Sequence, residues 1–210
     1  MNLKFVFPVF ILLLLVVALI PHPMHENTVT TKLIVQHYRN GKLIGTYVKD
    51  GDIFTRNIVN IWQGLLAFQT PGVNYKITLT DNSNVQFQAY VAYCENTASK
   101  CFIYPNNVKI AIGTGTTAPS INDYALGAQV ASATPSTSES TTSTSGYWQL
   151  TASFSFTQSY NITEFGIYQD FNDYGGATHT VLLNRDVIST PISVVSGDSL
   201  TVTYQIRVNS

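Results

Sequence analysis

The sequence predicts an all-β protein, an antiparallel sandwich of two β-sheets with one amphipathic α-helix and an N-terminal hydrophobic helix. Stretches such as TASFSF and LTVTYQIRV alternate apolar and polar residues, which is typical of half-buried antiparallel strands. The alternating strand and helix segments of a parallel sheet are not found. Charged residues are 11% of the chain, about half the usual share, and aromatic residues, which favour strands, are 12%.

The first residues have the pattern of an export signal. Lys4 precedes an apolar run over residues 5–20 that only Pro8 interrupts. This length suits either a cleaved signal peptide or an N-terminal membrane anchor, and both alternatives stay open for residues 1–24. Residues 25–210 then form a single domain outside the cytoplasm, extracellular or at the cell surface, with membrane contact only through the N-terminal segment.

The first elements after this segment are a hairpin and a helix. Asn40 and Gly41 separate two runs rich in β-formers, residues 32–38 and 42–48, and predict a type I′ turn. Residues 54–68 are expected to be helical, capped by Asp52 or Thr55 and ended by Pro71. The apolar face of this helix consists of Phe54, Ile58, Ile61, Trp62, Leu65 and Leu66.

Strands are predicted for most of the remaining chain, over residues 75–80, 85–93, 102–104, 108–112, 147–157, 162–168, 178–188 and 200–208. Between them, residues 132–146 read SATPSTSESTTSTSG, a low-complexity segment expected to be a flexible Ser/Thr-rich loop and a candidate for O-glycosylation. Asn161 lies in the N-glycosylation sequon NIT, either as a modified site or as a turn residue.

Two cysteines also point to export. Cys94 and Cys101 bracket the six residues ENTASK between two strand-like runs, a spacing that predicts a hairpin disulfide. Such a bond forms in an oxidising compartment and stabilises a fold by about 2–3 kcal/mol. The alternative is two thiols that never meet. A metal site is not expected, because no other cysteine or histidine is near.

A glycine-rich segment, IAIGTGTTAPSINDYALG, covers residues 110–127 and resembles a phosphate-binding turn. A phosphate site of this kind needs a lysine at the end of the loop, but no lysine or arginine follows Gly115 before Arg185. We therefore interpret Gly113 and Gly115 as residues chosen for backbone conformation, with a positive φ at one of them. No cofactor is expected.

Other titratable residues give no catalytic motif. The four histidines lack a neighbouring nucleophile pattern. Asp170 and Asp173 could serve as glycosidase carboxylates or calcium ligands, but Asp, Asn and Gly in YQDFNDYGG favour a turn. Glu164 is expected to face solvent or to pair with Arg185. The net charge of −1 excludes a nucleic-acid surface. The protein is therefore predicted not to be an enzyme.

The order of several motifs resembles a module of phage tail and tail-fibre proteins, of which related β-domains occur in viruses and in exported archaeal proteins. The motifs are KDGDIFTRNIVNIWQGLLA, VKIAIGTGTTAPSINDYALG, ITEFGIY, LLNRDVI and DSLTVTYQIRV, and they cover most of the chain from Gly51 onward. The resemblance implies a β-sandwich in which the glycine loop and the ITEFG strand are turn and core features, not a catalytic site. The exported N-terminus and the cysteine pair depart from this family and favour a cell-surface protein.

A fainter resemblance is to the donor-strand pilins of archaeal thread filaments, exported β-sandwich subunits that each donate an N-terminal strand to the next. It rests on export, size, low charge and the β-prone segment TVTTKLIVQHY, and no diagnostic motif supports it. It implies a donor segment within residues 26–38. The alternative is that residues 32–38 complete the chain's own hairpin, so that donation would use the residues before Lys32. The nominated donor residues are Thr28, Val29, Thr30, Leu33 and Val35.

The function predicted from these observations is a non-enzymatic exported structural protein, a pilin-like filament or surface-layer subunit that associates with identical subunits. The first alternative is a virion or tail-fibre-like structural protein. The second is a surface module that binds or hydrolyses carbohydrate, with glycans as ligands.

Overall fold

A computed structural model of the chain describes residues 28–51, 53–58, 75–78, 80–82, 84–87, 107–142, 145–172 and 178–209. The hydrophobic leader, the cysteine pair Cys94 and Cys101, Asp173 and most of the predicted helix lie outside the described residues. Within the described part of the chain, no helix has the length and apolar character needed to cross a membrane.

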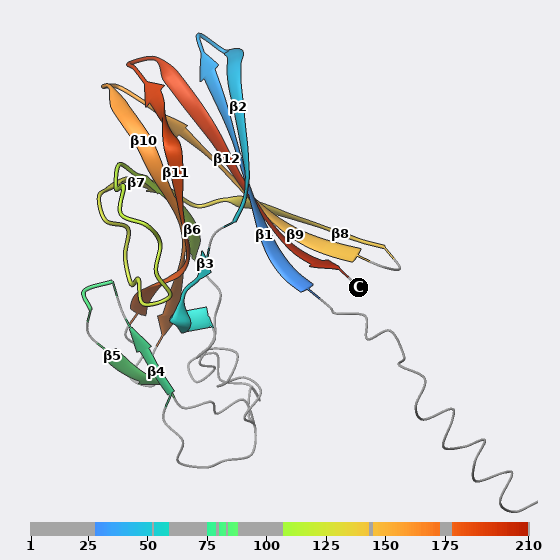
Figure 1. The fold of residues 1–210 in the computed structure, drawn as a ribbon, viewed down its shortest axis with the longest axis vertical. Coiled ribbons are helices and arrows are strands. Elements are labelled where there is room, and N and C mark those ends of the chain that lie inside the picture. Colours follow the sequence, from blue (N-terminus) through green and yellow to red (C-terminus); the bar gives the residue numbers. More distant parts are fainter. Residues whose placement is uncertain are drawn as a thin grey trace, which may run out of the picture.

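Two five-stranded antiparallel sheets face each other and confirm the predicted all-β sandwich (Figure 1). The first sheet has the order β2-β1-β12-β9-β8, with β1 (Thr28–Arg39), β2 (Lys42–Asp50), β8 (Ser136–Thr141), β9 (Ser145–Ser155) and β12 (Asp198–Asn209). The second has the order β3-β11-β10-β6-β7, with β3 (Ile53–Phe54), β6 (Val108–Gly113), β7 (Gln129–Ala133), β10 (Tyr160–Asn172) and β11 (Thr178–Val194). A separate pair consists of β4 (Tyr75–Thr78) and β5 (Asn84–Phe87).

The hairpin of β1 and β2 turns where the sequence predicted. Asn40 has a φ of 51° and Gly41 a φ of 73°. A type I′ turn requires positive φ at both central residues, and Asn and Gly tolerate it best. The turn prediction is therefore confirmed.

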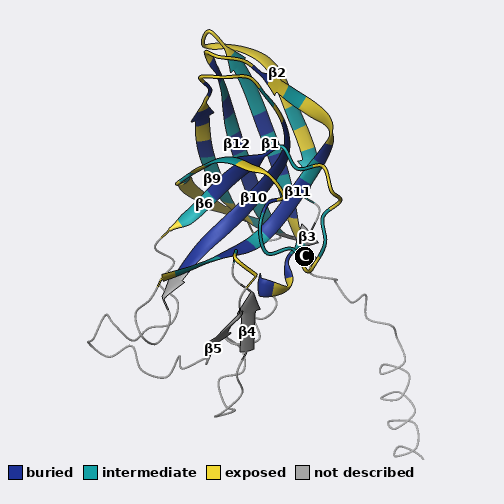
Figure 2. Ribbon diagram, turned by 90° about the vertical axis from the view of Figure 1, so that its left-hand side faces the viewer, coloured by how far each residue is buried: buried dark blue, intermediate teal, exposed yellow. Residues whose placement is uncertain are grey.

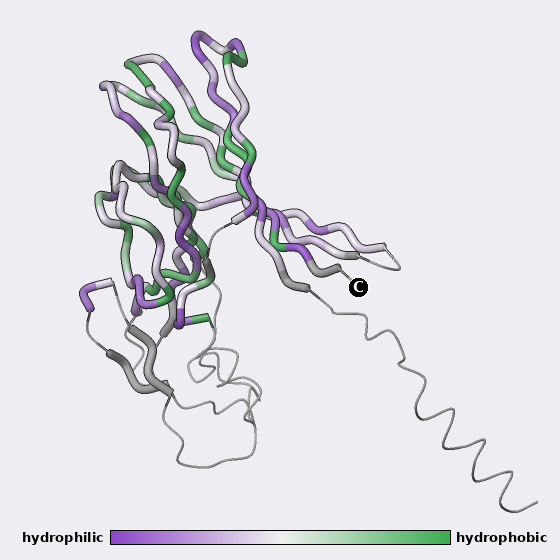
Figure 3. The backbone as a smooth tube through the Cα atoms, in the orientation of Figure 1, coloured by the Kyte–Doolittle hydropathy of each residue, from purple (hydrophilic) through white to green (hydrophobic). Residues whose placement is uncertain are grey.

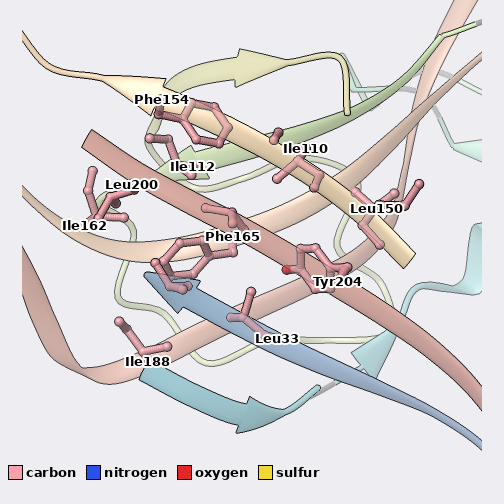
Figure 4. Packing of buried hydrophobic residues seen from close by; sticks show 14 of the residues in the cluster. Leu33, Ile110, Ile112, Leu150, Phe154, Ile162, Phe165, Ile188, Leu200 and Tyr204 are labelled. Atoms are coloured by element: carbon pink, nitrogen blue, oxygen red, sulfur yellow. The ribbon is translucent and has the colours of Figure 1, made fainter. Parts of the chain in front are cut away.

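The main core lies between the inner faces of the two sheets (Figure 4). Leu33 and Val35 of β1 are 0% and 1% exposed, and their neighbours on β12 are Tyr204 and Val202. Phe165 of β10 enters the same cluster from the second sheet. Along β1 and β12, buried residues alternate with partly exposed ones, which is the period of two expected of strands with one face in the core.

One half of the first sheet extends past the second sheet. In Figure 1 the start of β1, the end of β12, β8 and the start of β9 run away from the sandwich as an arm. Every residue of β8 is exposed, as are Tyr147 and Trp148 of β9. The arm is mostly hydrophilic or neutral in Figure 3, in agreement with its lack of a covering layer.

The prediction for residues 132–146 as a loop is wrong. Residues 136–141 form β8, which pairs antiparallel with β9 from Ser136 opposite Thr151 to Thr141 opposite Gly146. Hydroxyl side chains do not prevent pairing, because the backbone supplies the ladder and threonine is β-branched. A strand made of STSEST can also stay fully exposed at an edge, since it has nothing apolar to bury.

The predicted start of the helix is also wrong. Phe54 lies in β3 opposite Asn184 of β11, and only one helical turn, residues 56–58, is described after it. Thr55, directly before this turn, is bonded to β11: its hydroxyl donates to the carbonyl of Leu182 (2.6 Å) and its N–H to that of Leu183 (2.8 Å). Bonds to β11 thus override the helical periodicity at this point.

Leu33→Ala should lower the free energy of unfolding by about 2–5 kcal/mol, because it removes a fully buried side chain and leaves a cavity. Ile34→Ala is the matched control on the partly exposed face of the same strand, and should cost about 1 kcal/mol or less. Urea unfolding of both variants measures the difference. Equal losses would contradict the assignment of faces in β1.

Candidate functional site

The glycine-rich segment lies on the outer face of the second sheet. Residues 114–128 connect β6 to β7, and Leu126 packs in a small cluster with Ala111, Tyr168 and Leu182, apart from the main core. The N–H of Leu126 donates to the Tyr168 hydroxyl (2.7 Å). Burial of this hydroxyl raises the pKa of Tyr168. The segment is therefore an ordered cover over the sheet.

The Glu164 carboxylate is the centre of this region. It is 0% exposed, although it projects from β10 on the face away from the main core. Its Oε1 accepts a hydrogen bond from the N–H of Gly127 (2.7 Å), and its Oε2 from those of Ala128 (3.1 Å) and Gly115 (3.2 Å). Both ends of the glycine-rich segment are thus bound to one carboxylate.

Arg185 of β11 supplies the compensating charge. Of the two alternatives predicted for Glu164, exposure to solvent or pairing with Arg185, the second is therefore the one found. Its Nε and Nη2 lie 2.7 Å and 2.6 Å from Oε1 of Glu164, and its Nη1 donates to Oδ2 of Asp123 (2.7 Å). The remaining donors reach the carbonyls of Thr117 and Ala118. Burial alone would lower the pKa of Arg185, but the hydrogen bonds and charges of the two carboxylates outweigh it and raise the pKa.

The two glycines have a steric reason, not the positive φ that was predicted. Among the described glycines, positive φ occurs at Gly41 and Gly197 and not at Gly113 or Gly115. A Cβ on Gly115 would lie 2.6 Å from Oε2 of Glu164, and one on Gly113 would lie 2.7 Å from the same atom. Glycine is required here because the backbone must approach the buried carboxylate closely.

This geometry explains why the segment looks like a phosphate-binding turn. Backbone N–H groups in a glycine-rich turn bind an anion, but the anion here is the protein's own Glu164 carboxylate. Arg185 balances the charge, and Asp123 binds its other side. We therefore regard this cluster, which we call the glutamate clasp (Glu164, Arg185, Asp123 and the N–H groups of Gly115, Gly127 and Ala128), as a structural device.

The other sequence candidates lie elsewhere. Asp170 forms an ion pair with Lys109 (3.0 Å) and accepts a hydrogen bond from Thr180 (2.6 Å). Burial acts to raise the pKa of Asp170, but these hydrogen bonds and the lysine charge lower it overall. Asn161 is exposed, and its side-chain oxygen accepts a hydrogen bond from Ser193 (2.8 Å). Within the described residues, no three His, Cys, Asp or Glu side chains gather as metal ligands.

A second charged cluster was not predicted from the sequence. Asp198 is 1% exposed, and its carboxylate lies 2.9 Å from Nε2 of His37 and 2.9 Å from Nε of Arg39. It also accepts the N–H of Val195 (3.0 Å) and so closes the turn between β11 and β12. The Arg39 guanidinium holds the pKa of Asp198 well below its usual range. His37 and Arg39 lie far from Asp198 in sequence, and the β1–β12 register brings them to it.

An open groove of about 300 Å³ lies between the edges of the two sheets. Its walls are residues 130–133 of β7 and residues 153–157 at the end of β9, with Tyr160 at one side. The rings of Phe156 and Tyr160 are tilted against each other with centroids 6.1 Å apart. Phe154 and Phe156 also belong to the main core, so the groove reaches core side chains from outside.

The nominated donor segment pairs within its own chain. β1 lies between β2 and β12, paired with β12 from Thr28 to Arg39 and with β2 only from Lys32 to Arg39. Leu33 and Val35 are in the core, as the self-paired alternative requires. Of the nominated residues, Thr28, Val29 and Thr30 have one strand neighbour instead of two among the described strands.

Comparison with known proteins gives no relative: no protein-family model, no curated protein and no solved structure matches the chain.

Gly115→Ala should destabilise the protein by about 1–3 kcal/mol, because the added methyl overlaps the Glu164 carboxylate. Gly45→Ala is the matched control, since nothing lies within 4 Å of its Cβ position; it should be neutral or stabilise by up to about 1 kcal/mol. Thermal unfolding measures both. ATP should leave the unfolding temperature of the wild type unchanged, and saturable ATP binding would contradict the structural interpretation of the loop.

The stability of the protein should fall with acidification, in part through Asp198. Its pKa is lowered in the folded state, so its contribution is complete above the unfolded value of about 4 and is lost as the pH falls below it. Asp198→Asn should therefore be less stable at neutral pH, with a shallower loss of unfolding free energy between about pH 5 and pH 2. Denaturant unfolding across this range measures the slope. Glu139→Gln, in the exposed strand β8, is the control and should leave the pH dependence of the unfolding free energy unchanged. If Asp198→Asn has the same slope as the wild type, Asp198 is not a source of the acid sensitivity.

Proposed function

We propose that the chain is an exported, non-enzymatic structural subunit that assembles with identical copies at the cell surface by β-strand addition, as a filament or surface layer. The observation that carries the proposal is the groove between β7 and β9, beside a strand edge with which no described strand pairs. An extended segment that enters such a groove gains main-chain hydrogen bonds from the edge and buries side chains in the core.

The unpaired edge belongs to the second half of β9. β8 pairs with β9 only between Gly146 and Thr151. Residues 152–155 pair with β12 on one side, and no described strand pairs with their other side. β7 is likewise the last strand of its sheet. A segment in the groove would extend the line of β8 and cover Phe154 and Phe156.

The donor we propose is the segment before Lys32 of a second copy, residues 26–31. From Lys32 onward β1 is held by two strands and fills the core with Leu33 and Val35, so its removal would cost the subunit its own core. Residues 28–31 have β12 alone as strand neighbour. The small side chains of Thr28–Thr31 suit a groove walled by alanine and serine.

The positions of donor and acceptor support a head-to-tail contact. Thr28 lies opposite Asn209, which pairs with Ser145 at the start of β9. The groove is at the other end of the same strand, beside Ser155. A contact between opposite ends of identical subunits is heterologous, and it produces a filament when the rotation between neighbours does not close into a ring.

Carbohydrate binding is the second candidate for the same groove. Phe156 and Tyr160 offer ring surfaces, and Ser132, Ser153 and Ser155 offer hydroxyl groups around them. This combination of an apolar surface with a few polar groups is typical of small-ligand sites. Saturable binding of a soluble glycan that the donor segment does not compete with would favour this candidate.

Truncation of the exported chain to begin at Lys32 should abolish filaments seen by negative-stain electron microscopy while leaving the domain folded. The reason is that the truncation removes the donor segment and retains the residues of β1 that fill the core. Circular dichroism and thermal unfolding check the fold. Unchanged filaments from the truncated chain would contradict strand donation.

A second pair of variants tests the acceptor. Ser132→Trp places a large ring in the groove from an exposed position of β7, and should reduce assembly by an order of magnitude or more. Ser138→Trp is the matched control, an exposed serine of β8 outside the groove. Equal assembly by both variants would place the contact elsewhere.

A further inference from the structure

The two outer edges of the first sheet differ in character. One edge is β8, which consists of serine, threonine and Glu139. The other is β2, which carries three of the large exposed apolar side chains: Leu43 (46% exposed), Ile44 (49%) and Val48 (52%). Figure 2 shows β2 as largely exposed, and Figure 3 shows hydrophobic residues directly after the polar hairpin tip. An exposed apolar edge strand is a site for pairing with another strand.

The edge of β2 is open in the described part of the chain. β2 pairs with β1 on one side, and no described strand pairs with its other side. The ammonium group of Lys49 points back to the second sheet and donates to the carbonyl of Val187 (2.8 Å). The Lys49 charge is therefore directed away from the edge of β2 and does not hinder pairing with another strand there.

We propose that the β2 edge pairs antiparallel with β2 of a second copy, around a two-fold axis at Thr46. The sequence of the strand, KLIGTYVKD, is complementary to itself in this register. The stretch from Ile44 to Val48 carries no charge, so this register sets no like charges opposite each other; Lys42 and Asp50 lie just beyond its two ends. Cross-strand pairs of opposite charge stabilise a sheet, whereas like charges destabilise it.

The central pairs of this register also match. Ile44 lies opposite Val48, and each is an exposed apolar side chain in the single chain. Thr46 lies opposite its own copy, a favourable hydroxyl pair. Tyr47, whose side chain packs against the main core of its own chain, lies opposite Gly45, whose Cβ position is open, so this pair has no steric conflict. By contrast, β8 contains no apolar residue, so pairing of β8 with β8 of a second copy would form no apolar cross-strand contact.

A bulge limits the extent of the contact. The register of β2 against β1 shifts between His37 and Tyr38, which leaves Ile44 as the additional residue. Bulges bend and twist an edge strand, so the regular part of the new pairing is the stretch from Ile44 to Val48. The contact is isologous and uses the same edge of both copies, so it closes as a dimer. It does not depend on strand donation at the groove.

A cysteine at the axis tests the register. In it, residue 46 faces its own copy at a Cα distance of about 4.5–5.5 Å, within disulfide range. Thr46→Cys should therefore give a disulfide-linked dimer on mild oxidation of the full chain. Val48→Cys is the matched control on the same strand, because residue 48 faces residue 44. Non-reducing electrophoresis measures the amount of disulfide-linked dimer in both variants. The wild type is the control for cross-links through its own cysteines, Cys94 and Cys101. No cross-link at 46, or equal cross-linking at 46 and 48, would overturn the proposal.

Charge at the axis gives an independent test. Thr46→Lys and Thr46→Asp each place two like charges next to each other, and each variant alone should sediment as a monomer. A mixture of the two should recover the dimer, which also shows that both variants fold. The groove variant Ser132→Trp should still dimerise, so a failure of the β2 contact is distinguishable from a failure of strand donation. A dimer that persists in both single variants, or a wild type that stays monomeric at high concentration, would refute the contact.

Discussion

The glutamate clasp is the contact on which the second sheet and its loop depend. A buried carboxylate is costly unless charge and hydrogen bonds replace its water, and Glu164 receives both, from Arg185 and from three backbone N–H groups. Loss of one partner in a buried pair costs about 3–5 kcal/mol. An apolar pair of similar volume could supply as much stability, but it would not bind the loop backbone at both ends. The clasp therefore determines the path of the loop.

The position of the proposed acceptor follows from that path. Ala128, which donates to Glu164, directly precedes β7, and its carbonyl accepts the N–H of Thr114 (2.9 Å). The edge of β7 is thereby fixed relative to β6, and β7 is one wall of the groove. A buried ion pair on the outer face thus positions an edge whose proposed use is assembly. Preorganisation of this kind lowers the entropic cost of binding an extended segment.

Local sequence patterns predicted many of the strands and one turn, but they did not predict the contacts between residues that are distant in sequence. Asn40 and Gly41 predicted the turn because the requirement for positive φ is local. The alternation in β9 and β12 predicted these two strands because burial on one face imposes a period of two. Glycine at 113 and 115 was recognised as meaningful, but its reason is a carboxylate about 50 residues away in sequence, which no local rule contains. Asp198 depends in the same way on the register of β1 and β12.

The errors have the same physical origin. Phe54 fits a helical face, yet the bonds from Thr55 to β11 place it in a strand. The STSEST segment lacks an apolar signal, yet the exposed edge of β9 supplies the hydrogen-bonding partner that makes it a strand. That strand covers β9 only as far as Thr151, and the remaining edge is the acceptor we propose. A low-complexity sequence therefore has a structural consequence here: β8 ends its pairing with β9 at Thr151, and no described strand continues its line beside residues 152–155.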